Sequence, residues 1–393
     1  MRSLHHLVRI AMRFRRLVVL ALLICVSSRP VNAAPGDTLH TFTPPPGQVA
    51  YRFGHAFGRL DGDIFVGGQN PDVSFVANVY DGKSYQFERS FSISAASGAT
   101  ISDFIWSTAV HNGQLLVGGV WTRAISGFGV VHLVDGATGN GVRTFRNTTV
   151  PPNSNDAFGL SVAFSGNDVL VTDYLAPGGS PTGAVYLYDG GTGSLLRTFL
   201  NPTGRLNDDF GGTLAASGDS ILIGAPRYRG PDGRESGAVY LFDRESGALV
   251  NTVYGAGTSA IERFGQSMAV DGSRVLIGGQ QTGPQAVYDA RNLSLIQHIP
   301  DSRPYRPDYY TAGAFVDHAV ALTRFAGDPD LRHVVKLFDG NSGELIADLY
   351  SPGPSSIAYF GPAAAAGNDV LVGIGHKTAC CCTKGRTHPD RPC

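Results

Sequence analysis

The sequence predicts an all-β fold: a seven-bladed β-propeller built from four-stranded antiparallel blades. Three observations lead to this prediction: a glycine-rich composition, a repeat of about fifty residues and tight-turn motifs within each repeat. The chain has 393 residues, of which 51 are Gly and 23 are Pro, and only 16% of its residues are charged. Such a composition favours many short strands joined by turns over long helices.

Two landmarks recur in phase along the chain. An aromatic or apolar residue followed by Asp occurs six times, with Asp spacings of 54, 54, 54, 46 and 50 positions. These aspartates are Asp81, Asp135, Asp189, Asp243, Asp289 and Asp339. An aromatic residue opens each unit, at Phe53, Phe104, Phe158, Phe210, Phe264, Tyr309 and Phe360. A unit of this size cannot bury both faces of its own sheet, so the repeat predicts sheets stacked radially.

The pattern within a unit predicts four short strands. The first strand follows the opening aromatic residue, the second is an apolar run, and the third ends at the Asp. Turns such as Ser217-Gly218 suit a tight hairpin between the first two strands, because Gly tolerates positive φ. The motif Asp-x-x-Thr/Ser-Gly suits the turn between the last two strands.

The N-terminal region is predicted to close the ring. "TLHTF", residues 38–42, resembles the fourth strand "LLRTF", residues 195–199, and Phe42 precedes Phe53 by the same 11 positions that separate Phe199 from Phe210. We expect this strand to complete the last blade and to cover its open edge. The repeat pattern ends after Gly375, so the third strand of that blade has no candidate.

Residues 1–33 are predicted to be a secretory signal peptide. Arginines precede the apolar run Leu17 to Val26, small residues stand at Val31-Asn32-Ala33, and the run is too short to span a bilayer. We expect residues 34–378 to form the propeller and residues 379–393 a divergent Cys-rich tail, with no membrane span. The expected product is a monomer that is secreted, at the cell surface or in the periplasm. Removing six arginines leaves 25 basic and 32 acidic side chains, a net charge of −7, which disfavours nucleic acid as a partner.

The stretch from Phe210 to Pro226 begins with Phe-Gly and ends with Gly-Ala-Pro. Phe-Gly also stands at 53–54, 158–159, 264–265 and 360–361. With these motifs the chain resembles the FG-GAP β-propellers of the integrin-alpha type over roughly residues 37–375. The resemblance implies adhesion or ligand binding rather than catalysis.

The same resemblance implies calcium in the loop between the first two strands. Calcium takes six to eight oxygen ligands, and the loop of the family carries several acids. Here the corresponding turns are only two residues long, with Asp61 and Asp63 in the first unit and Asp219 alone in the fourth. We therefore expect no metal and no other cofactor.

The longer loops are predicted to form the binding face. In a four-stranded meander both hairpin turns of a blade lie on one side of the ring, and the remaining loops lie on the other. Those loops are rich in Trp, Tyr and Arg, the residues that dominate binding hot spots. The candidate ligand-binding residues are Trp121, Arg123, Tyr174, Arg227, Tyr228, Arg229, Tyr305 and Arg306. The expected partner is an extracellular protein or a glycan.

Two other functions stay open. One is a propeller enzyme, acting on a polysaccharide or resembling a quinoprotein, with acids and histidines at the central channel. Quinoprotein blades place a docking Trp eight positions after the Asp, whereas this chain has Arg89, Arg143, Arg197, Asn251, Gln297 and Ala347 there. This difference favours a protein that is not an enzyme and has no catalytic residues. The other is a purely structural surface protein.

Overall fold

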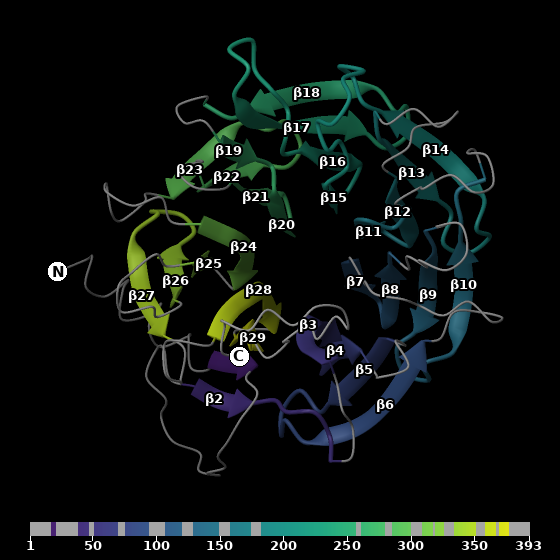
Figure 1. Ribbon diagram of the computed structural model, residues 1–393, viewed down its shortest axis with the longest axis vertical. Helices are drawn as coiled ribbons and strands as arrows, with labels where there is room; N and C mark the ends of the chain where they lie inside the picture. Colours follow the sequence, from purple (N-terminus) through teal and green to yellow (C-terminus); the bar gives the residue numbers. More distant parts are fainter. Residues whose placement is uncertain are drawn as a thin grey trace, which may run out of the picture.

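The computed structural model describes residues 17–20, 38–46, 51–69, 75–93, 107–119, 129–148, 158–173, 182–256, 261–279, 285–299, 309–316, 319–325, 334–350, 358–366 and 369–376. Every regular element within these ranges is a β-strand. The sheets stand around a common centre, as Figure 1 shows, so the predicted all-β propeller is confirmed.

Six sheets are antiparallel blades of four consecutive strands. Blade 1 has β3 (Tyr51–Leu60), β4 (Asp63–Gln69), β5 (Phe75–Tyr80) and β6 (Phe87–Ile93), and blade 2 has β7 (Ser107–His111), β8 (Gln114–Gly118), β9 (Val131–Asp135) and β10 (Gly141–Phe145). Blade 3 has β11 (Val162–Ser165), β12 (Asp168–Asp173), β13 (Ala184–Tyr188) and β14 (Leu195–Leu200). Blade 4 has β15 (Thr213–Ser217), β16 (Ser220–Ala225), β17 (Glu235–Asp243) and β18 (Leu249–Tyr254), and the short β19 (Ile261–Phe264) pairs in parallel with β17. Blade 5 has β20 (Ser267–Asp271), β21 (Arg274–Gly278), β22 (Gln285–Asp289) and β23 (Leu295–Ile299), and blade 6 has β24 (Tyr309–Val316), β25 (Ala319–Phe325), β26 (Val334–Asp339) and β27 (Leu345–Tyr350).

Burial follows the position of a strand within its blade. In blade 2 the first strand, β7, is half-buried, β8 and β9 are almost wholly buried, and β10 is largely exposed. Figure 1 shows the reason, because first strands lie nearest the centre of the ring and fourth strands form its rim. The middle strands are covered on both faces by neighbouring blades, so they can be continuously apolar.

The last sheet differs from the others. It combines β28 (Ala358–Ala366) and β29 (Asp369–His376) with β1 (Leu17–Leu20) and β2 (Thr38–Thr41), in the order β2-β1-β29-β28. β1 is parallel to both of its neighbours. In Figure 1 the purple N-terminal strands accordingly stand beside the yellow C-terminal ones.

The prediction of seven antiparallel blades is therefore wrong, because six sheets are of that kind. The seventh repeat supplies only the hairpin of β28 and β29, and the next position is taken by "LVVL" from the segment predicted to be a signal. A parallel neighbour cannot be joined by a tight hairpin and must come from elsewhere in the chain. The predicted closure is not confirmed, since β2 pairs with β1 and not with a third strand of the repeat.

The Phe-Gly motif fills the space between blades. Phe210 is buried in a cluster shared by blades 3 and 4, where it packs beside Phe199 and Phe242. Gly211 has a φ of +87°, and a Cβ there would lie 2.5 Å from the Cγ2 atom of Thr172 in blade 3. The Thr172 hydroxyl donates to the Gly211 carbonyl at 2.7 Å. Phe and Gly are thus both required by close contact with the preceding blade.

Hydroxyl groups also contact the glycine of a Phe-Gly pair at two other junctions, in these cases from the first strand of the preceding blade. Ser107 donates to the Gly159 carbonyl at 3.0 Å, and Thr213 donates to the Gly265 carbonyl at 2.6 Å. Each of these bonds joins the second residue of a Phe-Gly pair to the preceding blade. The motif therefore marks a blade-to-blade junction.

The Asp-x-x-Thr/Ser-Gly motif forms the predicted turn between third and fourth strands. Asp189 accepts from the Thr192 backbone N at 2.6 Å and from its hydroxyl at 2.9 Å, and the Gly193 N donates to the Asp189 carbonyl at 2.8 Å. The two bonds from Thr192 lower the pKa of the Asp189 carboxyl below its ordinary value. Equivalent side-chain bonds occur at Asp81, Asp135 and Asp243.

A side chain of the outer strand docks onto this turn in the next blade. Arg197 of β14 donates to the carbonyls of Arg244 (3.2 Å), Ser246 (2.9 Å) and Glu245, all in the β17–β18 turn. The equivalent contacts are Arg89 to Gly136, Arg143 to Gly191 and Asn251 to Asn292. These are the positions where a quinoprotein would place Trp, so polar docking replaces aromatic docking here.

Replacing Arg197 with Ala removes three donors to backbone carbonyls. We expect Arg197→Ala to lower the free energy of unfolding by about 1–2 kcal/mol, because hydrogen bonds from charged donors stabilise more than neutral ones. Chemical denaturation measures the change. The control is Arg234→Ala, whose partner Asp232 is half-exposed like Arg234 itself, and no measurable loss is expected. Equal losses in the two variants would contradict a special role for the blade-to-blade contact.

The glycine of the β17–β18 turn, Gly247, gives a second test of this contact. Gly247 has a φ of +73°, and a Cβ there would lie 2.8 Å from the Arg197 Cδ atom. We expect Gly247→Ala to cost about 1–2 kcal/mol from the left-handed backbone. In Gly141→Ala, the control, the added Cβ meets nothing within 4 Å, so its stability should match the wild type. Thermal melts of both variants measure the difference. An unchanged melting temperature for Gly247→Ala would disprove the requirement for glycine at this position.

Candidate functional site: the loop surface of blade 4

Three of the predicted binding residues lie within the described part of the chain. Arg227, Tyr228 and Arg229 lie one residue after β16, in the loop that leads to β17. The other candidates, Trp121, Arg123, Tyr174, Tyr305 and Arg306, lie outside the described residues. The site can thus be built from blade 4 and from the segments that connect it to blades 3 and 5.

Backbone hydrogen bonds hold this loop against its surroundings. The Arg227 N donates to the Asp208 carbonyl at 3.1 Å, and the Tyr228 N donates to the Ala225 carbonyl at 3.0 Å. Arg229 and Glu235 form an isolated antiparallel bridge. The three predicted residues therefore project from an ordered turn, which lowers the entropy cost of binding through them.

Tyr228 lies at the centre of a small stack. The Tyr228 ring is 5.0 Å from the Tyr254 ring, with an interplanar angle of 38°. Arg205 lies on the loop between blades 3 and 4, and its Cζ atom is 5.6 Å from the centroid of the Tyr228 ring. Arg205 also donates to the Arg229 carbonyl at 2.7 Å. The Tyr228 ring packs against the core shared by blades 3 and 4, while Tyr254 and Leu206 are 51% and 55% exposed.

Ion pairs surround the stack. Arg229 donates to Glu235 at 2.6 Å, and Arg263, from the approach to blade 5, lies 3.3 Å from the other oxygen of that carboxylate. Arg227 lies 3.5 Å from Asp209. Burial raises the pKa of the Asp209 carboxyl, and the charges of Arg227 and Arg263 oppose this shift.

Two residues that precede the Phe-Gly pairs at this surface have left-handed backbones, as does Asn207, with a φ of +64°. Asp209 has a φ of +55° and Arg263 a φ of +47°, and each immediately precedes the Phe of a Phe-Gly pair. In both cases the carbonyl accepts from a backbone N three residues later, with lengths of 2.8 Å at Gly212 and 3.0 Å at Gln266. The conformation therefore belongs to the entry turn of a blade and is not local strain at a reactive site.

Sequence reasoning identified the loop but missed most of its neighbours. Arg205, Leu206 and Asp209 come from the blade-to-blade connection, Tyr254 from the end of β18, and Arg263 from β19. The connection "RLNDD" before Phe210 was a usable signal, because blade-to-blade loops share the face of the second-to-third loops. No sequence pattern indicated Tyr254, because its contact with Tyr228 depends on where the end of β18 lies relative to the β16–β17 loop.

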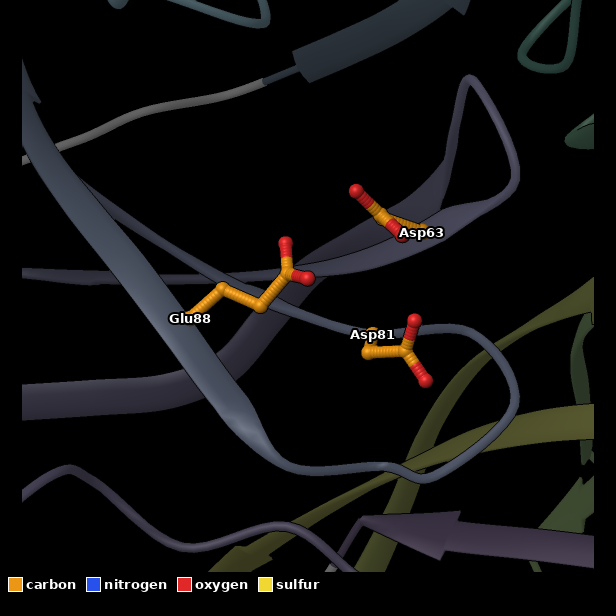
Figure 2. Close-up of side chains that lie close together, drawn as sticks. All are labelled: Asp63, Asp81 and Glu88. Carbon is orange, nitrogen blue, oxygen red and sulfur yellow. The ribbon is translucent and has the colours of Figure 1, made fainter.

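A cluster of acids lies in blade 1, as Figure 2 shows. The carboxylates of Asp63, Asp81 and Glu88 offer oxygens within 4.8 Å of one another. The Arg89 Nη1 atom lies 2.8 Å from Glu88 and 3.6 Å from Asp63, while Asp81 accepts three bonds from Lys83 and Ser84. Arginine thus supplies the positive charge at this cluster, which includes Asp63 of the hairpin compared above with the calcium loop.

The hairpins that correspond to the calcium loop of the FG-GAP family are tight. Leu60 pairs with Asp63, and Ser217 pairs with Ser220, so only two residues lie in each turn. Asp61 has a φ of +49° and Gly218 a φ of +56°, as such turns require.

The comparisons with known proteins agree with the architecture. A model of the FG-GAP repeat matches residues 201–242, which include the Phe-Gly/Gly-Ala-Pro unit of blade 4. No curated protein matches the sequence. The predicted FG-GAP resemblance is confirmed for this unit.

Solved structures show the same ring. The chain is similar to the β-propeller domain of Cps50 (Swd1) from Myceliophteria thermophila, with 14% identity, a TM-score of 0.56 and coverage of 85% of this chain and 96% of that one. It is similar to the WD40 repeats of RRP9 (14%, 0.55, covering 81% and 86%) and to U3-55K (14%, 0.56, covering 86% and 95%). At this identity the similarity shows the fold alone. Within the described ranges, no helix has the length and apolar character to cross a membrane.

The raised pKa of Asp209 gives a test of the site. Its folded-state pKa lies above the unfolded value, so ionisation at neutral pH disfavours the folded state, and this cost disappears as pH falls through that pKa. We expect Asp209→Asn to melt at an equal or higher temperature than wild type at pH 7, with the difference shrinking on acidification. Asn tolerates the left-handed backbone of this position.

Thermal melts across pH, with Asp232→Asn as the exposed control, measure the effect of Asp209→Asn. Asp232 is half-exposed, so this control should melt as the wild type does at pH 7. A lower melting temperature for Asp209→Asn at pH 7 would mean that its pairing with Arg227 outweighs its burial.

Proposed function

We propose that the protein is a binding module, which recognises an extracellular protein or glycan through the loop side of its propeller. The observation that carries this proposal is the ordered group of Arg205, Tyr228 and Tyr254, flanked by paired charges. Tyrosine and arginine combine contact area with directional hydrogen bonds, and a rigid scaffold holds them in place.

Binding without catalysis fits the chemistry of this surface. Asp209 and Glu235, two carboxylates of this surface, already face arginines. A general acid or base would need a free carboxyl or imidazole directed at a substrate. We accordingly propose a protein that is not an enzyme and needs neither metal nor other cofactor for this role.

The proposal includes secretion of an integrin-alpha-like propeller, closed by its N-terminal strand. Phe42, which follows β2, lies 4.8 Å from the Tyr80 ring, and the Tyr80 hydroxyl donates to the Thr43 carbonyl at 2.7 Å. Phe145 and Tyr188 lie 5.3 Å apart in the same relation between blades 2 and 3, where Tyr188 donates to the Arg146 carbonyl at 3.4 Å. The similarity between these two pairs of aromatic rings supports β2 as the fourth strand of the last blade.

Arrays of extracellular matrix proteins and of glycans, probed with the full chain, test the function. We expect at least one ligand, whose binding the double substitution of Arg227 and Tyr228 by Ala weakens by about tenfold or more, as truncation of hot-spot residues does. Arg291→Ala on the hairpin-turn side is the matched control and should bind as wild type does. A ligand that is insensitive to the double substitution would disprove the assignment of this face.

A further inference from the structure

The third strand of a regular blade is enclosed on both of its faces. β5, β9 and β13 are buried along almost their whole length, because the neighbouring blades cover them from either side. A segment in the third place of a blade is therefore mostly apolar at successive positions. In the last sheet this place lies between β29 and β2, and β1 fills it with the sequence "LVVL".

β1 reaches this place without a turn to either neighbour. Leu17 to Leu20 pair in parallel with Val370 to Gly373 of β29, and β1 also pairs in parallel with β2. Residues 21–37 separate β1 from β2, and β29 belongs to the far end of the sequence. Strand pairing, rather than a hairpin, therefore holds this segment, which is also how a sheet accepts a strand from another polypeptide.

β1 satisfies two strand edges at once. Within the described ranges it is the one strand that pairs with β2, and it borders β29 on the side opposite β28. Val370 and Val372 pack in a cluster with blade 6, Leu371 packs in a cluster with blade 1, and each is at most 1% exposed. Removing β1 would leave facing rows of unpaired backbone N–H and C=O groups on β29 and β2.

The predicted cleavage site lies between β1 and β2. Residues 1–33 include β1, whereas β2 and Phe42 would remain in the protein after cleavage. Phe42 is fully buried and contacts the Tyr80 ring of blade 1, so β2 keeps an anchor of its own. Cleavage would therefore take β1 away and leave both of the edges that it pairs with.

We propose that the gap between β29 and β2, here called the strand-acceptor site, binds an extended apolar segment of another polypeptide once residues 1–33 are removed. In the unprocessed chain β1 occupies this site and blocks it. The inference rests on the secretion included in the proposed function, because signal cleavage is the step that removes β1. It adds a second binding surface, built from the last sheet, to the loop surface of blade 4.

The chemistry of the site selects a polypeptide strand. Neighbouring strands lie about 4.8 Å apart, so the removal of one leaves a gap of a single strand's width. The two edges offer donors and acceptors at the repeat of a β-strand, which an extended backbone matches and a glycan does not. Because β29 packs against blade 6 on one face and blade 1 on the other, the entering segment needs apolar side chains at successive positions, as in "LVVL".

A labelled peptide of residues 13–22, which joins the β1 sequence to solubilising arginines, is the probe. The acceptor is the full chain with Val18→Pro, because proline lacks the N–H that a central strand needs, so β1 no longer fills the site. We expect this variant to melt below the wild type, and the peptide to bind it and raise its melting temperature. The wild-type chain should bind the peptide at least about tenfold more weakly, because its tethered β1 competes at about millimolar effective concentration.

Two controls separate strand pairing from other kinds of binding. Val26→Pro changes the same apolar run outside β1, and this variant should behave as the wild type does. The same peptide carrying Val18→Pro keeps the arginines and the apolar character, and it should not bind. If the Val18→Pro chain does not fold alone, refolding with the unmodified peptide should yield folded protein, and refolding with the proline peptide should not.

The outcomes distinguish this proposal from the proposed function. A peptide that does not bind Val18→Pro, that binds it no better than the wild type, or that binds as well with proline would overturn the strand-acceptor site. Retention of residues 1–33 in the secreted protein, measured by mass spectrometry, would overturn the opening of the site by cleavage. Replacing Arg227 and Tyr228 by Ala should leave peptide binding unchanged; a loss would place the peptide on the loop surface and overturn the proposal. Failure of the loop surface to bind a ligand is thus measured separately.

Discussion

The fold depends on contacts that join each blade to the next. A blade on its own has two apolar faces and cannot bury either, so its strands are stable only when its neighbours are in register. Two devices fix that register. On one side, hydroxyls such as that of Thr172 bond to the Phe-Gly carbonyl of the following blade, and on the other, Arg197 reaches the next Asp-turn. Because the contacts are polar and directional, they set the angle between blades as well as their separation.

The sequence was sufficient to predict these units but not how the ring closes. Repeats at a fixed period, with turn residues whose φ must be positive, define strands and hairpins locally, so the six regular blades follow from residues such as Gly193 and Gly211. The last sheet draws on both ends of the chain, and no local pattern states which strand lies beside β29. Parallel pairing in particular leaves no turn signature in the sequence.

The candidate site was likewise predicted only in part from the sequence. Composition identified the loop of Arg227 to Arg229, since Tyr and Arg in a loop stand out from the surrounding strands. Its neighbours were not predicted, because Leu206 and Tyr254 belong to other segments and their exposure is decided by packing. The role of Arg197 was also hidden, since the sequence showed only that Trp was missing there. A repeated position can keep its structural task while changing its chemistry.

The composition of the last sheet has a consequence for the order of events during synthesis. Phe42 and Phe53 lie near the start of the chain, and they pack in one cluster with Leu371 from near its end. Blades 1 to 6 can dock one after another as the chain emerges, but this cluster must wait for β29 to be made. Closing so long a loop is entropically slow relative to local pairing. Until then the blade 1 residues of this cluster lack their partner from β29, so this apolar face of blade 1 is still exposed in the nascent protein.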